Sequence, residues 1–250
     1  MKDLPDKSVD LTITSPPFDD LRDYHGYVFD HEPILSELYR VTKDGGVVVW
    51  VVADATHDGE TGTSFRQALY AMSLNFKLWD TMIYFRNAVT NPSKIRYYNC
   101  FQYMFVFSKG RPKTINLLKD RKNKTAGKKA NYRKQRNADG EIYLHPSFKA
   151  GIGRPEHSVR WNVWQYDVGS LIMADDREWV GHPAIFPLKL AEDHIKSWSN
   201  EGDLVFDPMC GSGQTLCAAK KLNRRYLGMD ISEEYCGISN KRLNLYQTKD

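Results

Sequence analysis

Two short segments, one near each end of the chain, most constrain what this sequence can fold into. The first, Thr14-Ser15-Pro16-Pro17-Phe18, ends the apolar run 9–14, and the second, which spans 207–215, follows the apolar run 204–206. Each run is typical of a buried strand, and the double proline ends the first because proline cannot donate to a sheet ladder. Open α/β folds bind their ligands at the carboxyl ends of parallel strands. The sequence therefore predicts that both segments lie at one edge of a mainly parallel sheet.

The spacing of apolar residues between the two segments predicts alternating helices and strands. Leu35, Leu38 and Val41 recur as on one face of a helix, which Gly45-Gly46 is expected to end. The unbroken apolar run 47–52 is typical of a strand buried on both faces. The other elements expected from the sequence are helices over 64–74, 187–198 and 214–222 and strands over 78–85, 101–107 and 226–230.

Positive charge is concentrated in one part of the chain. Residues 109–136 contain 12 Lys or Arg and one Asp, so this stretch carries +11 and the rest of the chain −7 of the overall net charge of +4. Such a run alone is typical of a solvated face. Here it is accompanied by aromatic residues, namely Tyr132, Tyr143, Phe148, Trp161 and Trp164. Cations for phosphates together with aromatic rings for bases favour a nucleic-acid surface.

We therefore expect an inserted basic lobe over 110–167 that faces nucleic acid. Its candidate contacts are Lys119, Arg121, Lys122, Lys124, Lys128, Lys129, Arg133, Lys134 and Arg136. Other classes of site are not indicated. No CxxC pair or suitably spaced histidine accompanies the four cysteines, Cys100, Cys210, Cys217 and Cys236, so we predict neither a metal site nor disulfides. No apolar run approaches the roughly 20 residues that span a bilayer, and we expect a cytoplasmic protein.

The turn after residue 206 predicts a nucleoside ligand that carries an amino acid. Gly211 and Gly213 let the backbone approach a ligand closely, and Asp230 follows at an offset where an acid accepts hydrogen bonds from ribose hydroxyls. Leu216 stands where a dinucleotide fingerprint needs a third glycine. Asp207 would repel a pyrophosphate but could accept from a cationic amino group. The alternative, that the glycines only make a tight strand-to-helix turn, stays open.

Three segments resemble motifs of the amino-methylating DNA methyltransferases. Phe206-Asp207-Pro208-Met209-Cys210-Gly211-Ser212-Gly213-Gln214-Thr215 is similar to their S-adenosylmethionine-binding motif, DPFxGSGTT. Thr14-Ser15-Pro16-Pro17-Phe18 is similar to their catalytic motif, (S/D)PP(Y/F), and Gly181-His182-Pro183-Ala184-Ile185-Phe186-Pro187 to the segment that lines the methionine side. The catalytic motif first, a basic variable region next and the cofactor motif last is the order of the circularly permuted β group. The resemblance extends from about Leu4 to Leu243.

The resemblance implies a Rossmann-like α/β methyltransferase fold, circularly permuted, with an inserted basic target-recognition region. Its parts would be residues 1–109 as the catalytic half of the core, 110–167 as the insert and 168–250 as the cofactor-binding half. It also implies S-adenosylmethionine as cofactor and DNA as partner, in a protein encoded by a bacterium, an archaeon or a phage. A cognate restriction endonuclease and a second copy of the chain are further expected partners.

Individual residues receive roles from the same resemblance. The catalytic residues are Ser15, Pro16, Pro17 and Phe18. The residues implied to contact the cofactor are Thr14, His182, Pro183, Phe186, Phe206, Asp207, Pro208, Gly211, Ser212, Gly213, Gln214, Thr215, Asp230 and Ile231. The Ser15 hydroxyl and the Pro16 carbonyl are expected to accept hydrogen bonds from the amino group of a flipped base, on which Phe18 stacks.

The residue before the double proline bears on the target base. In the family, Ser at this position usually accompanies methylation of cytosine N4 and Asp methylation of adenine N6, so Ser15 favours cytosine and leaves adenine as the alternative. Carbon-5 methylation is not indicated because none of the four cysteines follows a proline. A nucleic-acid-binding protein that has lost its activity is the third hypothesis.

The sequence departs from the family pattern in two places. Family members usually carry another strand and a Gly-Asp pair before the segment Leu4-Pro5-Asp6-Lys7-Ser8, which here comes almost directly after Met1. We therefore expect a sheet that lacks this N-terminal edge strand, or one whose edge a partner subunit covers. Met209-Cys210 and Gln214 also differ from the cofactor motif, and they predict a changed pocket wall.

Overall fold

The computed structural model describes residues 1–18, 29–56, 58–87, 94–129, 134–144, 152–167 and 186–245. Contacts between Cα atoms divide the chain into two compact units. The larger, called the core unit below, comprises Met1–Asn116 and Asn162–Asp250, and the smaller, the insert unit, comprises Leu117–Trp161. Its bounds are narrower than the expected 110–167, because residues on both sides of it pack in the core unit.

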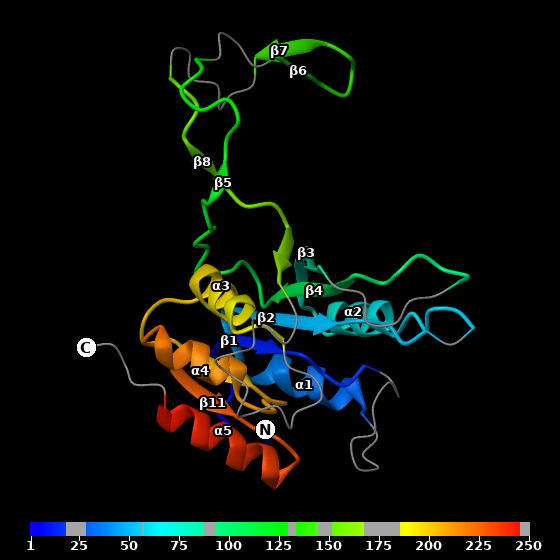
Figure 1. Ribbon diagram of the computed structural model, residues 1–250, viewed down its shortest axis with the longest axis vertical. Helices are drawn as coiled ribbons and strands as arrows, with labels where there is room; N and C mark the ends of the chain where they lie inside the picture. Colours follow the sequence, from blue (N-terminus) through cyan, green and yellow to red (C-terminus); the bar gives the residue numbers. More distant parts are fainter. Residues whose placement is uncertain are drawn as a thin grey trace. The chain divides into compact units, whose positions relative to one another are not determined.

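A seven-stranded sheet forms the centre of the core unit in the described part of the chain (Figure 1). In spatial order its strands are β11 (Arg225–Gly228), β10 (Leu204–Asp207), β1 (Val9–Thr14), β2 (Thr42–Val52), β4 (Phe101–Ser108), β3 (Lys77–Arg86) and β9 (Val163–Tyr166). β4 is antiparallel to both of its neighbours, and the other six strands share one direction. The predicted mainly parallel α/β fold is confirmed. The six strands end at one edge of the sheet, called the carboxyl edge below.

The described helices are α1 (His31–Val41), α2 (Thr63–Ser73), α3 (Leu188–Trp198), α4 (Gln214–Lys221) and α5 (Glu233–Leu245). Leu38 of α1 and Ala68 of α2 share a buried apolar cluster with Trp50 of β2. α3 and α4 pack against each other, and α3 also contacts β1. Every residue of the run 47–52 is buried, so β2 is covered on both faces as its composition predicts. None of these helices has the length and apolar character needed to cross a membrane.

The junction between α1 and β2 differs from the sequence prediction. The helix ends at Val41, where the Thr42 hydroxyl donates a 2.6 Å hydrogen bond to the Leu38 carbonyl, and the strand begins at once. Gly45-Gly46 therefore does not end the helix. The glycines lie in an irregularity of the β1–β2 ladder, where Gly45 has a φ of +79°. A Cβ at Gly46 would lie 2.8 Å from the Thr42 methyl group, so this position has no room for a side chain.

Strand β9 and the small sheets of the insert unit were not expected from the sequence. Val163–Tyr166 lies within the range expected for the inserted lobe, yet it pairs in parallel with β3. The insert unit contains two antiparallel pairs of short strands, β5 (Arg121–Lys122) with β8 (His157–Ser158) and β6 (Lys134–Arg136) with β7 (Ile142–Leu144). The residues after 161 therefore return to the main sheet before the predicted end of the insert.

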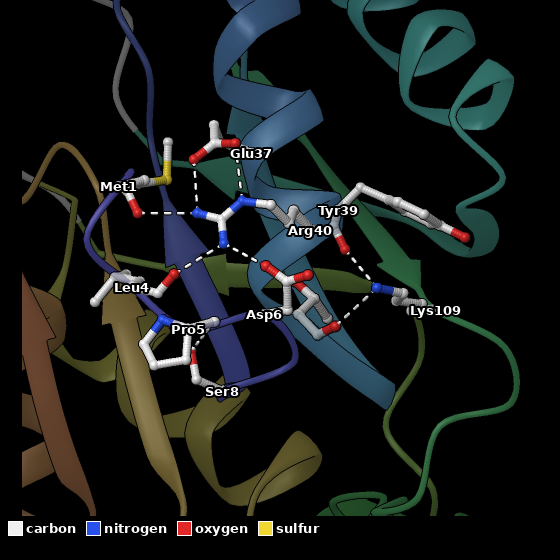
Figure 2. A network of polar contacts seen from close by, with 10 residues as sticks. Met1, Leu4, Pro5, Asp6, Ser8, Glu37, Tyr39, Arg40 and Lys109 are labelled. Atoms are coloured by element: carbon white, nitrogen blue, oxygen red, sulfur yellow. Dashed lines mark hydrogen bonds and ion pairs between the residues drawn. The ribbon is translucent and has the colours of Figure 1, made fainter.

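At its opposite end, the sheet finishes with β11, which pairs only with β10 among the described strands. Residues 1–8 add no strand there, because they lie against α1 (Figure 2). The Arg40 guanidinium donates to the carbonyls of Met1 and Leu4 at 3.1 and 2.8 Å, and it also contacts the carboxylates of Asp6 and Glu37. The additional edge strand that members of the resembled family usually carry is not among the described elements.

Candidate active site

The two strand-ending segments lie side by side at the carboxyl edge. β1 and β10 pair in parallel, with Leu11 opposite Val205 and Thr12 opposite Phe206. The hydroxyl of Thr215, in the first turn of α4, donates a hydrogen bond of 2.8 Å to the Asp207 carboxylate and also contacts the Ile13 carbonyl at 3.3 Å. The prediction that both segments meet at one sheet edge is confirmed.

The segment after β1 is only partly exposed. Pro16 is buried, whereas Ser15, Pro17 and Phe18 are half-buried. Phe18 packs against the apolar cluster that contains Trp50, so its ring already has an apolar neighbourhood on the core side. The following residues, 19–28, lie outside the described part of the chain. The motif is thus anchored in the core at the point where β1 ends.

The turn after β10 uses both of its glycines for backbone geometry. Gly211 and Gly213 have φ values of +49° and +81°, in the region that side chains disfavour. A Cβ on Gly213 would lie 2.3 Å from the Ser239 Oγ of α5. The second glycine is therefore required by the approach of α5, which the sequence had not indicated. Cys210 lies in the same turn, and burial raises the pKa of its thiol far above the usual range.

Asp230, just after β11, stabilises this turn with both of its carboxylate oxygens. Oδ2 accepts from the Gly211 N–H at 2.8 Å and Oδ1 from the Ser232 N–H at 3.0 Å. Each carboxylate oxygen has a second lone pair, so the side chain retains the capacity to accept from ribose hydroxyls. Ile231, the next residue, exposes 68% of its surface. An acid followed by an exposed apolar side chain suits a ribose and its base.

Asp207 is a buried carboxyl group with a perturbed pKa. Only 2% of the residue is exposed. Burial raises its pKa to about 6 and the negative charge of Asp230 adds to this, while hydrogen bonds from Thr215 and the Met209 N–H offset part of the rise. A cation placed beside this carboxylate would stabilise its charged form. The group therefore fits the cationic amino group that the sequence predicted as its partner.

A buried arginine of α5 braces the turn, and sequence reasoning missed it. Arg242 is 1% exposed. Its Nη1 donates to the Ser212 carbonyl and hydroxyl at 2.7 and 3.1 Å, and its Nη2 donates 2.8 Å to the Gln214 amide oxygen. The Gln214 amide nitrogen in turn donates 3.2 Å to the Phe186 carbonyl. Gln214 thus connects α5 with the segment before α3. The sequence had predicted only that this residue changes the wall of the cofactor pocket.

The described residues that were predicted to contact nucleic acid differ in their exposure. Most of them are exposed in the insert unit: Lys119, Lys122, Lys124, Lys128, Lys129, Lys134 and Arg136. Arg121 is half-buried, donates to the Val159 carbonyl at 3.1 Å and lies over the Trp161 ring. Trp164 was expected to serve the nucleic-acid surface, but it is buried in the core unit with its ring 4.6 Å from that of His194. That expectation is wrong, because β9 belongs to the main sheet.

Several predicted residues lie outside the described part of the chain, namely His182, Pro183, Arg133, Tyr132 and Phe148. The described residues include no group of three or more His, Cys, Asp or Glu that could hold a metal ion. The site that the structure assembles therefore consists of the end of β1, the turn after β10, and the acid after β11.

Comparison with known proteins relates this chain to a family of enzymes. A family model for N6/N4 methyltransferases, described as DNA methylase, matches residues 9–241. The orphan methyltransferase M.BamHII of Bacillus amyloliquefaciens is 57% identical over 243 residues, which cover 96% of this chain and 91% of that protein.

Solved structures of low sequence identity share the fold. The PvuII DNA methyltransferase (cytosine-N4-specific) superposes with a TM-score of 0.62 at 19% identity, over 100% of this chain and 90% of that one. The protein TTHA0409 of Thermus thermophilus, in complex with S-adenosyl-L-methionine, gives a TM-score of 0.62 at 21% identity, over 98% and 89% of the two chains.

Proposed function

The chain belongs to the DNA methylase family, and on that premise we propose that it transfers a methyl group from S-adenosylmethionine to N4 of a cytosine flipped out of DNA. One observation carries the proposal. The Ser15-Pro16-Pro17-Phe18 segment and the glycine turn follow two adjacent parallel strands at the same sheet edge. A methyl donor held by the turn and a base held by the segment would thus be neighbours.

The proposed reaction requires that the amino group of the base be made nucleophilic. Its lone pair is delocalised into the ring, and two hydrogen-bond acceptors localise it. The Ser15 hydroxyl and the Pro16 carbonyl supply these acceptors, and Pro17 favours an extended backbone at Pro16. Phe18 stacks on the base, and this contact offsets part of the cost of flipping.

Transfer is direct in this scheme. S-adenosylmethionine supplies, when bound, an electrophilic methyl group on a sulfonium sulfur. The amino nitrogen would form a bond to the methyl carbon as the carbon–sulfur bond broke, and the nitrogen would lose one proton to solvent. Positioning by the two segments supplies much of the rate enhancement. The protonated, buried Cys210 thiol has no part in it.

The residues in and beside the turn fit three parts of the donor, namely its amino group, its ribose and its adenine. Asp207 is buried with a raised pKa, so it would gain from a cationic amino group beside it. Asp230 can accept from ribose hydroxyls, and Ile231 offers apolar surface to the adenine. Phe186 approaches the turn through the hydrogen bond from Gln214. These assignments, and those of the other predicted cofactor residues, are part of the proposal.

The choice of cytosine depends on Ser15. Mass spectrometry of nucleosides from DNA treated with enzyme and methyl donor tests it, with Ser15→Ala as the matched inactive control. N4-methylcytosine is expected. N6-methyladenine would move the function to the alternative, and 5-methylcytosine would contradict both. DNA binding without cofactor binding, measured by calorimetry, would instead support the hypothesis of lost activity.

The biological setting follows from DNA as substrate. We expect the enzyme to act in the cytoplasm, where bacterial DNA lies. The relative M.BamHII is named an orphan methyltransferase, and by analogy this chain acts without a dedicated endonuclease. The endonuclease partner expected from the sequence is less favoured on this ground. A second copy of the chain stays a prediction for the edge at β11, which pairs only with β10 among the described strands.

A further inference from the structure

A cluster of exposed apolar and basic residues lies outside the insert unit, between β3 and β4. Residues 94–98, called the 94–98 segment below, read Lys94-Ile95-Arg96-Tyr97-Tyr98. Ile95, Tyr97 and Tyr98 expose 87%, 103% and 52% of their surfaces. Scattered exposed apolar residues are normal on proteins, but three within five residues form a patch that indicates a partner.

The charge around the segment favours an anionic partner. From residue 81 to 108 the chain contains Arg86, Lys94 and Arg96 and no Asp or Glu. This stretch belongs to the part of the chain whose net charge is −7, so its positive charge contrasts with the sign of that part as a whole. Two cations that alternate with aromatic and apolar side chains are typical of contacts to phosphates and bases.

The topology places the segment at the carboxyl edge. β3 and β2 are both antiparallel to β4, and β1 is parallel to β2, so β3 ends at the same edge as β1. The chain leaves the sheet there before it returns as β4 (Figure 1). At the base of this connection the Arg86 N–H donates a hydrogen bond of 2.7 Å to the Cys100 carbonyl, and the Phe101 N–H donates one of 3.3 Å to the Asn99 side chain. The segment is therefore tethered to the edge that carries Ser15.

The spacing of the strands suits a continuous DNA strand. Three inter-strand steps separate β1 from β3, and at about 4.8 Å each they span roughly 14 Å. With a rise of about 3.4 Å per nucleotide, this distance corresponds to about four nucleotides. A strand whose target base lies at Ser15 would thus pass the end of β3, from which the chain leads to the segment, a few nucleotides away.

We propose that the 94–98 segment is a DNA contact of the core unit, separate from the insert unit. Lys94 and Arg96 bind phosphates of a strand that flanks the target base, and Tyr97 and Tyr98 stack on its bases or sugars. The placement depends on the proposed catalytic role of Ser15, because that role defines the carboxyl edge as the face toward DNA.

The test compares two variants of the 94–98 segment, which follows the carboxyl end of β3, with two variants at the amino end of that strand. Tyr97→Ala and the double variant K94Q/R96Q change the segment, whereas Trp79→Ala and Lys77→Gln change an exposed aromatic residue and an exposed cation at the amino end of the strand. Binding to a labelled duplex of random sequence is measured by fluorescence anisotropy over a range of salt concentrations. Cofactor affinity, measured by calorimetry, verifies that each variant is folded.

Tyr97→Ala is expected to weaken DNA binding roughly 5- to 100-fold, as the loss of one stacking contact does. K94Q/R96Q should lower the salt slope by about 1 to 2, and the controls should bind as the wild type. Unchanged affinity and salt slope in both segment variants would overturn the inference. So would a loss of self-association in sedimentation with DNA binding intact, because the segment would then join two copies of the chain.

The nucleoside assay separates this inference from the proposed function. If the segment variants bind as the wild type while the wild type methylates DNA, the contact is refuted and the function stands. If the wild type methylates nothing while the segment variants bind more weakly, the function fails and the contact stands, because random-sequence binding requires no catalysis.

Discussion

The raised pKa of Asp207 makes cofactor binding depend on pH in a defined direction. The carboxyl is buried, and its pKa of about 6 lies above the ordinary value of 3.8. Only the ionised form attracts the cationic amino group of S-adenosylmethionine, so binding favours loss of the Asp207 proton. Below the pKa, binding must first overcome the cost of ionising the group. Cofactor affinity is therefore expected to rise with pH through about 6.

The size of the effect follows from the pKa. With a value near 6, Asp207 is ionised in about one tenth of the molecules at pH 5 and about nine tenths at pH 7. The affinity of the apo protein should therefore increase about tenfold between these two pH values. Above pH 7 this rise should end, because the ionisation of Asp207 is then nearly complete.

Isothermal calorimetry at pH 5, 6, 7 and 8 measures this dependence, with Asp207→Asn as the matched variant. Asparagine has the same shape and can still accept from the Met209 N–H, but it carries no charge at any pH. The variant should bind at least tenfold more weakly than wild type at pH 7 and show little pH dependence. Wild-type affinity that stays level from pH 5 to 8 would refute the assigned role, and so would a variant that retains the wild-type pH dependence.

The same carboxyl group has the opposite effect on the stability of the apo protein. Between pH 3.8 and about 6 the folded chain holds a proton that the unfolded chain has released, so the free energy of unfolding falls as pH rises. The two-unit difference corresponds to about 3 kcal/mol. Without cofactor, Asp207→Asn should thus be more stable than wild type at pH 7 in urea unfolding, and the difference should shrink toward pH 4. A variant less stable than wild type at pH 7 would contradict the pKa assignment.

Three further substitutions probe the supports of the site. Gly213→Ala should lower the free energy of unfolding in urea by about 2 kcal/mol or more, because its φ is +81° and the new Cβ would lie 2.3 Å from a side chain of α5. Gly237→Ala, which has open space around it, is the control and should be neutral or stabilising in the same assay. Arg242→Lys should weaken cofactor binding about tenfold in calorimetry, since one ammonium group cannot replace a guanidinium that donates to Ser212 and Gln214 with separate nitrogens. An unchanged affinity would show that the brace is dispensable. Arg40→Ala should speed hydrogen exchange in residues 1–8 with β1 still protected; equal exchange rates would mean that other contacts anchor this segment.

The sheet could be predicted because its strands carry strong local signals. The run 47–52 is apolar at every position, as expected for a strand covered on both faces, and the double proline at 16–17 ends β1 where the ladder can no longer continue. The neighbouring positions of β1 and β10 followed from the requirement that two segments act on one reaction. Local pattern and shared chemistry thus pointed to the same arrangement.

The errors arose where tertiary contacts override local pattern. Gly45-Gly46 resembles a helix end, but β2 starts before it and uses the glycines in an irregular part of its ladder. Val163–Tyr166 alternates exposed and buried residues as an edge strand should, yet the neighbouring basic residues suggested a surface lobe. β9 pairs with β3, which lies three strands from β1 in the sheet order. This pairing depends on contacts between residues far apart in the sequence, which no short window of sequence contains.

Gln214 shows how a departure from a family motif acquires a physical reason. The family usually has threonine here, which has a short side chain with a single hydroxyl group. The longer amide of Gln214 accepts from Arg242 with its oxygen and donates to the Phe186 carbonyl with its nitrogen. It therefore needs two partners that a local motif does not contain, one on α5 and one before α3. Because Arg242 is buried and would lose a hydrogen bond with threonine at 214, the glutamine and the arginine form a unit, and substitution of either should affect the turn in the same way.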